Sequence, residues 1–85
     1  MAKVTIYTTN YCGYCHAAKR LLDQLSVDYD ERDVTNNPGA RAELVGLAEG
    51  RTTVPQIFIG ERSIGGYTDL AALHDSGRLK AMLAD

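Results

Sequence analysis

The 85-residue sequence has no cluster of basic residues, and its formal net charge is −2. Proteins that hold nucleic acid by its phosphates present a concentrated positive surface, so we expect no nucleic-acid partner. No apolar run approaches the ~18 residues of a membrane-spanning helix, so we expect no membrane association. The N-terminus lacks a basic region followed by a long apolar stretch, which predicts no secretory signal and a cytoplasmic location.

The sequence also lacks internal repeats, low-complexity segments and any stretch that resembles an interdomain linker. Hydrophobic residues make up 45% of the chain and charged residues 24%, as in ordinary globular proteins, which excludes a disordered chain. A chain of this length can bury only a modest core. We therefore expect one small domain over residues 1–85.

Cysteine is scarce, but the two cysteines, Cys12 and Cys15, lie close together between an expected strand (4–8) and an expected helix (17–25). If the helix begins just after Cys12, its unpaired N–H groups and its dipole favour a thiolate there and hold the pKa below the usual value of about 8.5. Cys15 follows one turn later on the same face. The pair can therefore close a local disulfide, with Cys12 attacking and Cys15 resolving the mixed disulfide.

Three other interpretations of the cysteine pair remain open. Cys12, Cys15 and His16 supply at most three zinc ligands locally, whereas a structural zinc site needs four, and His74 is the only other histidine. The run from Cys12 to His16 also matches the C-x-x-C-H pattern of haem attachment. The missing signal peptide, the strand-rich sequence and Met82 as the only candidate methionine ligand away from the N-terminus speak against haem. The third interpretation is an inert buried pair.

The rest of the sequence alternates strand and helix patterns. Two parallel strands joined by a right-handed helical crossover should come first, and an antiparallel hairpin should follow. We expect Asn37 to cap the second helix, with Pro38 at its first position, and Thr68 or Asp69 to cap the third. The expected elements after the first helix are a strand beginning at 27, a helix over 40–48, strands over 54–59 and 62–64, a helix from 68 and a last helix over 78–84. They form a four-stranded mixed sheet flanked by helices.

A proline opens the apolar strand of the hairpin. Proline cannot donate to a sheet ladder, and it restricts Val54 to an extended conformation. A cis Val54–Pro55 bond would present the Val54 N–H and carbonyl to an extended peptide. A trans proline on an edge strand is the simpler interpretation, because only about one X–Pro bond in twenty is cis in folded proteins.

A glycine pair, Gly65-Gly66, precedes the third helix. Glycines leave the N-terminus of a helix bare and receptive to anions, and Thr68 and Asp69 can add a hydroxyl and a carboxylate. A tight turn followed by a helix cap is the simpler interpretation of the same residues.

Together, Cys12-Gly-Tyr-Cys15, Thr53-Val54-Pro55 and Gly65-Gly66-x-x-Asp69 resemble the motifs of the glutaredoxin family, in that order and over nearly the whole chain. The resemblance is to short bacterial dithiol members. It implies a thioredoxin fold, a cis Pro55 facing the cysteines and a glutathione groove. It also implies that Cys12 takes glutathione from a mixed disulfide and that Cys15 resolves it. The implied glutathione contacts are Tyr14, Thr53, Val54, Pro55, Gly66, Thr68 and Asp69.

Two residues depart from the family pattern. Gly13 stands where the family usually has proline, which relaxes the turn and should alter the reduction potential or the Cys12 pKa. Thr9 stands where many members have a lysine that pairs with the glycyl carboxylate of glutathione. Arg41 or Arg51 could supply the missing positive charge, although both are equally typical of a solvated surface.

The resemblance implies a glutathione-dependent thiol–disulfide oxidoreductase. Such an enzyme reduces disulfide-containing and glutathionylated proteins, and we expect it to be a monomer. The alternative is a carrier or sensor in which two chains bind a glutathione-ligated [2Fe–2S] cluster through Cys12 of each, as in some members with a small residue at the position of Gly13. A third hypothesis replaces glutathione by thioredoxin reductase as the reductant, but Tyr14 and the Gly65-Gly66-x-x-Asp69 motif favour glutathione.

Overall fold

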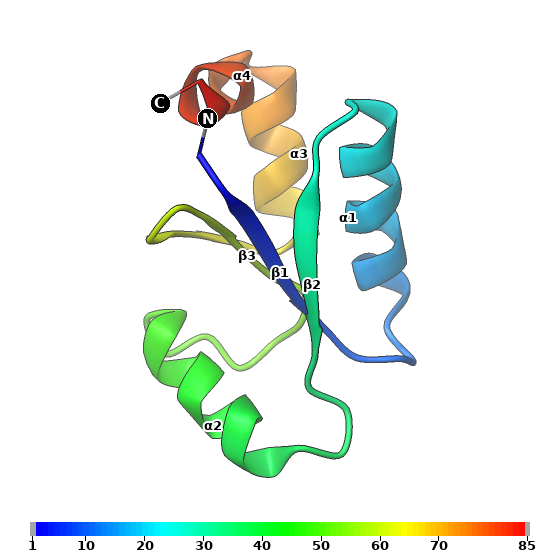
Figure 1. Ribbon diagram of the computed structural model, residues 1–85, viewed down its shortest axis with the longest axis vertical. Helices are drawn as coiled ribbons and strands as arrows, with labels where there is room; N and C mark the ends of the chain where they lie inside the picture. Colours follow the sequence, from blue (N-terminus) through cyan, green and yellow to red (C-terminus); the bar gives the residue numbers. More distant parts are fainter. Residues whose placement is uncertain (1, 85) are drawn as a thin grey trace.

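Strands and helices follow one another in the order expected from the sequence in the computed structural model, which describes residues 2–84 (Figure 1). None of its helices has the length and apolar character needed to cross a bilayer. The elements are β1 (Val4–Thr8), α1 (Gly13–Gln24), β2 (Tyr29–Asp33), α2 (Pro38–Leu47), β3 (Gln56–Ile59), β4 (Arg62–Gly65), α3 (Tyr67–Asp75) and α4 (Arg78–Leu83).

The four strands form one mixed sheet in the order β2-β1-β3-β4. Strand β1 pairs parallel to β2 and antiparallel to β3, and the β3–β4 hairpin is antiparallel. This confirms the predicted four-stranded mixed sheet flanked by helices. In the β1–β3 pair Tyr7 lies opposite Gln56. The segment that leaves β1 towards the cysteines and the segment that enters β3 from Pro55 therefore meet at one edge of the sheet.

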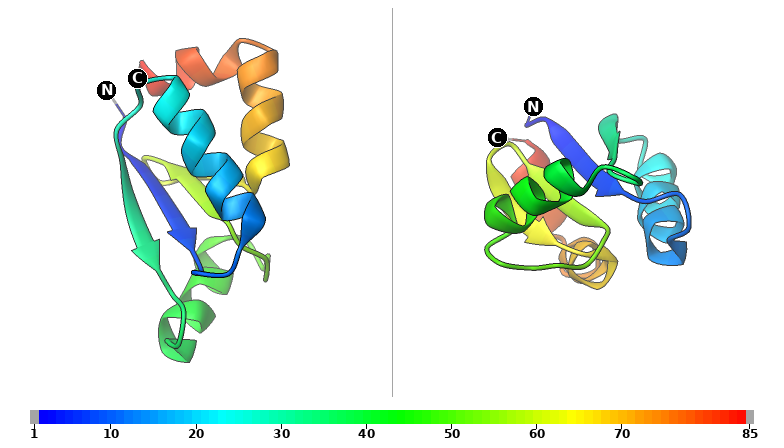
Figure 2. Two further views of the ribbon diagram at one scale, coloured as in Figure 1. Left: turned by 90° about the vertical axis from the view of Figure 1, so that its right-hand side faces the viewer. Right: turned by 90° about the horizontal axis from the view of Figure 1, so that it is seen from below.

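The main core lies between the sheet and the helices α1, α3 and α4, and Figure 2 shows α1 and α3 side by side. Alternate residues of β1 point into it, as the period-two pattern of a strand requires. The α1 helix contributes the fully buried Ala18 and Leu22, whereas Leu21 and the C-cap residue Leu25 are partly buried. The buried members of this core are Val4, Ile6, Ala18, Leu22, Ile57, Ile59, Leu70 and Leu79.

A smaller core lies on the other face of the sheet, under α2. Leu44 and Ala48 of the α2 region pack with Phe58, and the rings of Tyr7 and Phe58 meet edge to face with centroids 5.5 Å apart. Leu47, an apolar residue of the same helix, is 58% exposed. The α2 helix therefore rests on the sheet along a narrow stripe.

The predicted starts of β2 and β3 were each two residues too early. After α1, Ser26 takes a positive φ of 57°, and the Val27 N–H donates to the Leu22 carbonyl at 2.9 Å, which closes the helix end. The Val27 N–H is therefore unavailable for pairing, and β2 begins at Tyr29. Pro55 has no N–H to donate, and β3 begins after it at Gln56.

The predicted cap of α2 is confirmed, and the predicted cap of α3 is wrong. Asn37 Oδ1 accepts the Ala40 N–H at 3.0 Å, although the helix itself begins at Pro38 rather than Ala40. The α3 helix begins at Tyr67, with Gly66 as its N-cap, so Thr68 and Asp69 lie inside the first turn. A glycine cap carries no side-chain acceptor, and the sequence pattern therefore pointed to the next polar residues instead.

Candidate active site

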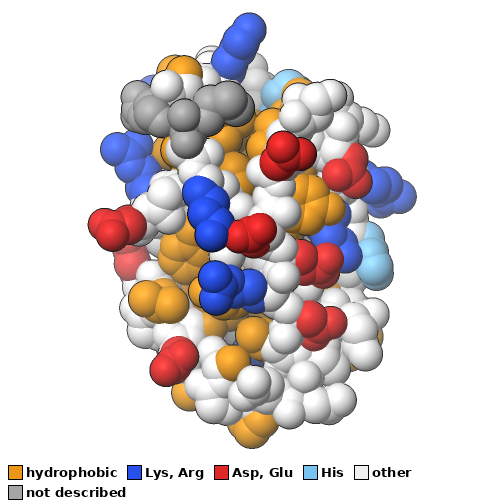
Figure 3. All heavy atoms as spheres, in the orientation of Figure 1, with side chains coloured by type: hydrophobic (Ala, Val, Ile, Leu, Met, Phe, Trp, Pro, Cys, Tyr) orange, Lys and Arg blue, Asp and Glu red, His pale blue; other side chains and the backbone are white. Residues whose placement is uncertain are grey.

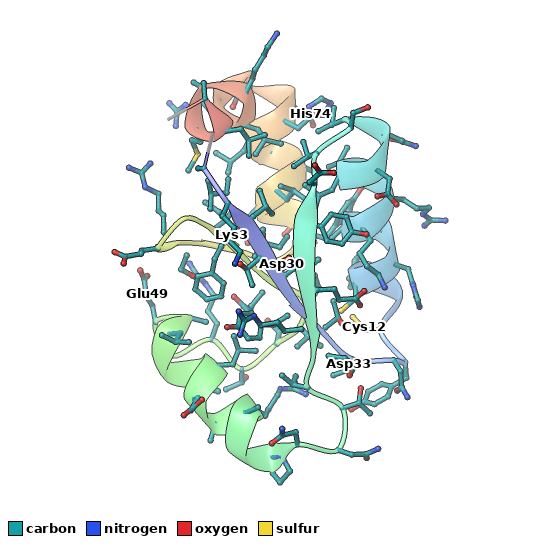
Figure 4. All side chains as sticks on the ribbon, viewed as in Figure 1. Lys3, Cys12, Asp30, Asp33, Glu49 and His74 are labelled. Atoms are coloured by element: carbon teal, nitrogen blue, oxygen red, sulfur yellow. The ribbon has the colours of Figure 1, made fainter. Side chains whose placement is uncertain are left out.

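Cys12 is the N-cap residue of α1 and lies just beyond the end of β1 (Figure 4). Its backbone is extended, with φ −106° and ψ 112°, and its Sγ accepts the Cys15 N–H at 3.1 Å. The sulfur therefore takes the place that a serine or aspartate oxygen usually takes at a helix start. An N–H aimed at Sγ from the positive end of a helix stabilises negative charge on that atom.

Cys15 lies one turn further along and is only 1% exposed, whereas Cys12 is half-buried. Both are free thiols. Burial, followed by the hydrogen bond with Cys12, raises the pKa of the Cys15 thiol to about 12, and the Thr9 backbone and the Lys19 ammonium act in the opposite direction. The neighbouring sulfurs thus differ in their access to solvent. Cys12 can meet a substrate, and Cys15 keeps its proton until a disulfide forms.

The segment before β3 reaches the cysteines. The Val54–Pro55 peptide bond is cis, as the family resemblance implies, and Cys12 Sγ lies 3.5 Å from the Val54 carbonyl oxygen. Gln56, which is fully buried, donates from Nε2 to the Thr53 carbonyl at 2.9 Å and to its hydroxyl at 3.3 Å. Gln56 thereby holds Thr53 and the residues after it in place beside the sulfur.

A groove of about 340 Å³ connects this segment with the start of α3. Two aromatic rings form part of its wall: those of Tyr14 and Tyr67, which stack with centroids 6.2 Å apart and planes inclined by 24°. All seven residues that the resemblance implies as glutathione contacts line it. The lining residues are Tyr14, Arg51, Thr53, Val54, Pro55, Gln56, Gly66, Tyr67, Thr68 and Asp69.

The α3 end of the groove depends on two glycines. Asp69 turns its carboxylate back over the helix start, where Oδ2 accepts the Gly66 N–H at 3.0 Å. Gly65 has a φ of 111°, and a Cβ there would collide with the same carboxylate. The glycine pair therefore makes room for Asp69 and leaves the first N–H groups of α3 without bulky side chains around them.

The two arginines that could replace the family's lysine are placed differently. Arg51 lines the groove and donates from Nη1 to the Ser63 hydroxyl at 3.0 Å. Arg41 donates from Nη2 to the Thr52 carbonyl at 3.0 Å and does not line the groove. Thr9 itself is 2% exposed, and its hydroxyl has no hydrogen-bond partner among residues 2–84.

The residues on which a zinc site would depend are not brought together. No group of three or more histidine, cysteine, aspartate or glutamate side chains in the described chain could hold a metal ion. Figure 4 shows His74 near the top of the molecule and Cys12 well below it, and His16 is exposed. Gln56 and Tyr67 also line the groove, although neither belongs to the motifs that the sequence offers for it. A polar residue inside the apolar run after Pro55 was the available signal for Gln56.

The family model described as Glutaredoxin matches residues 4–64, which carry the cysteine pair, the Pro55 segment and most of the sheet. This chain belongs to the glutaredoxin family. It is 50% identical over 84 residues to a glutaredoxin of Pseudomonas aeruginosa, with 99% of both chains covered. It is 47% identical over 83 residues to glutaredoxin 3 of Escherichia coli K12, covering 98% of this chain and 99% of the relative.

Solved glutaredoxin structures share the fold. The crystal structure of a buckwheat glutaredoxin–glutathione complex superposes with a TM-score of 0.89 at 32% identity, over 98% of this chain and 77% of that one. The solution structure of glutaredoxin from Brucella melitensis gives a TM-score of 0.86 at 44% identity, over 98% of this chain and 89% of that one. The sheet and helices therefore form the thioredoxin fold, and membership of the family makes the chain a thiol–disulfide oxidoreductase.

Proposed function

We propose that the chain is a glutathione-disulfide oxidoreductase that reduces disulfide-containing and glutathionylated proteins. The observation that carries the proposal is that Val54, a residue of the groove wall, has its carbonyl oxygen 3.5 Å from Cys12 Sγ, so that the sulfur lies next to the groove. A tripeptide lying along the groove would bring its thiol to this sulfur. The buckwheat relative, which was crystallised with glutathione, supports glutathione as that tripeptide.

The chemistry of the groove wall fits the charges of glutathione. The N-terminus of α3 suits the α-carboxylate of the γ-glutamyl end, and the Asp69 carboxylate suits its ammonium group. Thr53 and Thr68 add hydroxyls to the lining, and the stacked rings of Tyr14 and Tyr67 offer an apolar wall. Arg51 brings a positive charge to the lining, and the carboxylate of the glycyl end is the group that it would meet.

The reaction then runs through the Cys12 sulfur. Its thiolate attacks the glutathione sulfur of a mixed disulfide, the Cys12–glutathione bond forms, and the protein thiolate leaves with the electron pair of the broken bond. A second glutathione thiolate releases oxidised glutathione and restores Cys12. In the dithiol route Cys15 loses its proton and attacks the Cys12 sulfur instead, so that the Cys12–glutathione bond breaks and the glutathione thiolate leaves with its electron pair. The Cys12–Cys15 disulfide that results is reduced by two glutathione molecules, for which the cytosolic pool at about −220 to −260 mV is the natural source.

The cluster-binding hypothesis has less support. Cys12 is the half-buried sulfur and Cys15 is buried, so one chain offers a single accessible thiolate. A [2Fe–2S] cluster needs four ligands, and within residues 2–84 no further metal-binding group exists. A second copy of the chain and two external thiols would have to complete the set. We therefore retain the cluster only as an outcome that the experiment below can detect.

The test is a glutathione-coupled reduction assay on a small glutathione mixed disulfide, together with the absorbance spectrum of protein purified without oxygen. Turnover by a colourless monomer supports the proposal. Strong visible absorbance that is lost when the protein becomes monomeric, with little turnover before that loss, would favour the cluster. If glutathione does not reduce the oxidised protein but thioredoxin reductase does, the reductant is thioredoxin reductase and not glutathione.

A further inference from the structure

Lys19 and Glu31 form an ion pair beside the buried cysteine, outside the groove. Lys19 lies one helical turn after Cys15 on α1, a spacing that puts the two side chains on the same face. Its Nζ donates to Glu31 Oε2 at 2.9 Å, and its side chain is 22% exposed. The hydroxyl of Thr8, a residue only 1% exposed, donates to the same oxygen at 2.7 Å.

This pair differs from the other ion pair in the described chain. Lys3 and Asp30, which point towards one another in Figure 4, are 65% and 54% exposed and lie far from the sulfurs along β1. Lys19 is held from two elements, since Glu31 belongs to β2 and is fixed in turn by Thr8 of β1. The ammonium group is therefore held against β2 instead of extending into water, where its field would be screened, and Cys15 lies one helical turn away on the same helix face.

We propose that Lys19 is a positioning residue for the dithiol step, whose charge stabilises the thiolate that Cys15 carries when the Cys12–Cys15 disulfide opens or closes. The inference rests on the proposed function for its reductant, glutathione, but the step exists for any thiol. When a thiolate attacks Cys12 Sγ, a new disulfide forms there, the Sγ–Sγ bond breaks, and its electron pair leaves on Cys15. The Cys15 thiolate then takes a proton from water.

Burial destabilises the Cys15 thiolate relative to the thiol, and two neighbouring groups stabilise it. Burial and Cys12 raise the pKa of the Cys15 thiol, while the Thr9 backbone and, to a smaller extent, the Lys19 ammonium lower it. A thiol–disulfide exchange is faster when the leaving sulfur is the weaker base, and the same charge helps the attack of Cys15 in the reverse direction. At neutral pH the reduced protein carries Cys15 as the neutral thiol. Lys19 therefore acts mainly on the rates in both directions and little on the reduction potential.

The experiment compares Lys19→Met with Arg20→Met. Both variants lose one positive charge from α1, but Arg20 is the exposed next residue, pointing about 100° away around the helix. The oxidised protein is reduced by glutathione and, separately, by dithiothreitol in a stopped-flow instrument. If the missing charge makes Cys15 about tenfold weaker as an acid, a Brønsted coefficient of roughly 0.4–0.5 predicts about threefold slower exchange. Lys19→Arg should restore the rate.

The inference requires this slowing to be specific for Cys15. In a Cys15→Ser background, removal of a glutathionyl group depends on Cys12 alone, and Lys19→Met should leave its rate unchanged. The reduction potential of Lys19→Met should stay at the wild-type value. Equal slowing by Arg20→Met, an undiminished effect without Cys15, or a wild-type rate in Lys19→Met would each overturn the inference. The dithiothreitol arm tests Lys19 even if glutathione proves not to be the reductant, so the two proposals fail separately.

Discussion

The N-termini of α1 and α3 both face the groove, and they are capped in opposite ways. The α1 helix is capped by a reactive side chain, because Cys12 Sγ accepts the Cys15 N–H. The α3 helix is capped by Gly66, which has no side chain, and Asp69 reaches back from inside the helix to the Gly66 N–H. The same helix-end electrostatics therefore serves two purposes. At α1 it acts on a sulfur of the chain, and at α3 it is left open to a ligand.

The surroundings of the two helix ends follow from this division. Behind the α1 end lies a buried sulfur, that of Cys15, to which the proposed function gives the resolving step. The start of α3 is open in contrast, because Gly65 and Gly66 have no side chains to fill the space next to it. Figure 3 shows that basic and acidic side chains are interspersed on the face of the molecule that carries β2, without a field of one sign.

Removal of the reactive cap should have the largest effect. Cys12→Ser should abolish all thiol transfer, because a hydroxyl at neutral pH is not a nucleophile towards disulfides, while serine can still cap α1. Cys15→Ser should keep the monothiol removal of glutathione and lose the dithiol route. Both are measured in the glutathione-coupled assay. Transfer that survives in Cys12→Ser would contradict the assignment of the nucleophile.

The next prediction sharpens the difference between the two sulfurs. With its pKa raised to about 12, only about one Cys15 in 10,000 is a thiolate at pH 8, and it is also out of reach of the solvent. Iodoacetamide at this pH should therefore place a single group on the native reduced protein, at Cys12, as peptide mass spectrometry can show. In guanidinium chloride both cysteines should react. Early labelling of Cys15 in the native protein would sink this prediction.

The same shift makes stability depend on pH. The native state holds the Cys15 proton more tightly than the unfolded chain, in which the thiol has its ordinary pKa near 9.0. The stabilisation is therefore complete below about pH 9 and is lost as the pH rises towards 12. The free energy of unfolding from urea titrations should fall between pH 8 and 10, and less so in Cys15→Ala.

The α3 end is tested by separating the charge of Asp69 from its hydrogen bond. Asp69→Asn keeps an oxygen for the Gly66 N–H but loses the charge, whereas Asp69→Ala loses both. A charge-assisted contact worth about 1–3 kcal/mol corresponds to roughly a five- to 150-fold rise in the apparent KM for glutathionylated substrates. We expect this rise in both variants and a loss of thermal stability mainly in Asp69→Ala. An unchanged KM in Asp69→Asn would remove the carboxylate from recognition.

The two helix ends also show how much the sequence can predict. The α1 end was predictable because its signals are local: a β-branched strand, a cysteine pair at helical spacing and an apolar stripe all fall within residues 4–25. The cap of α3 was missed because a glycine cap leaves no side-chain signal. The fold itself followed from the order of the elements and the handedness of the crossover. The element boundaries were predicted less well: α1 begins at Gly13 instead of residue 17, and β2 and β3 each begin two residues later than expected.

The groove required the tertiary structure. Arg41 and Arg51 look alike in the sequence, and their roles separate only because Arg41 turns to the Thr52 carbonyl while Arg51 lines the groove. Tyr67 joins the groove by stacking on Tyr14, a contact between the first turns of two helices more than fifty residues apart. Such pairings depend on how α1 and α3 pack, which no local pattern encodes.

The smallest expected effect concerns Gly13, the first residue of α1. A Cβ at Gly13 would meet nothing within 4 Å, and Cys12 before it is already extended, as a residue preceding proline prefers. Proline is favoured at the first position of a helix and removes freedom from the unfolded chain. Gly13→Pro should therefore stabilise the protein by about 0.4–1 kcal/mol. Urea unfolding measures this, with Gly13→Ala as the control that adds a Cβ without closing a ring.

A stabilised Gly13→Pro variant that keeps its glutathione-coupled rate would show that the α1 end needs no flexibility, only the Cys15 N–H directed at Cys12 Sγ. If the variant is stabilised but its glutathione-coupled rate or its reduction potential changes, Gly13 sets the reactivity of Cys12. The substitution would then have altered the turn between Cys12 and Cys15. Destabilisation would contradict the open space around Gly13. The α3 end cannot be stiffened in the same way, since proline at Gly66 would remove the N–H that Asp69 accepts.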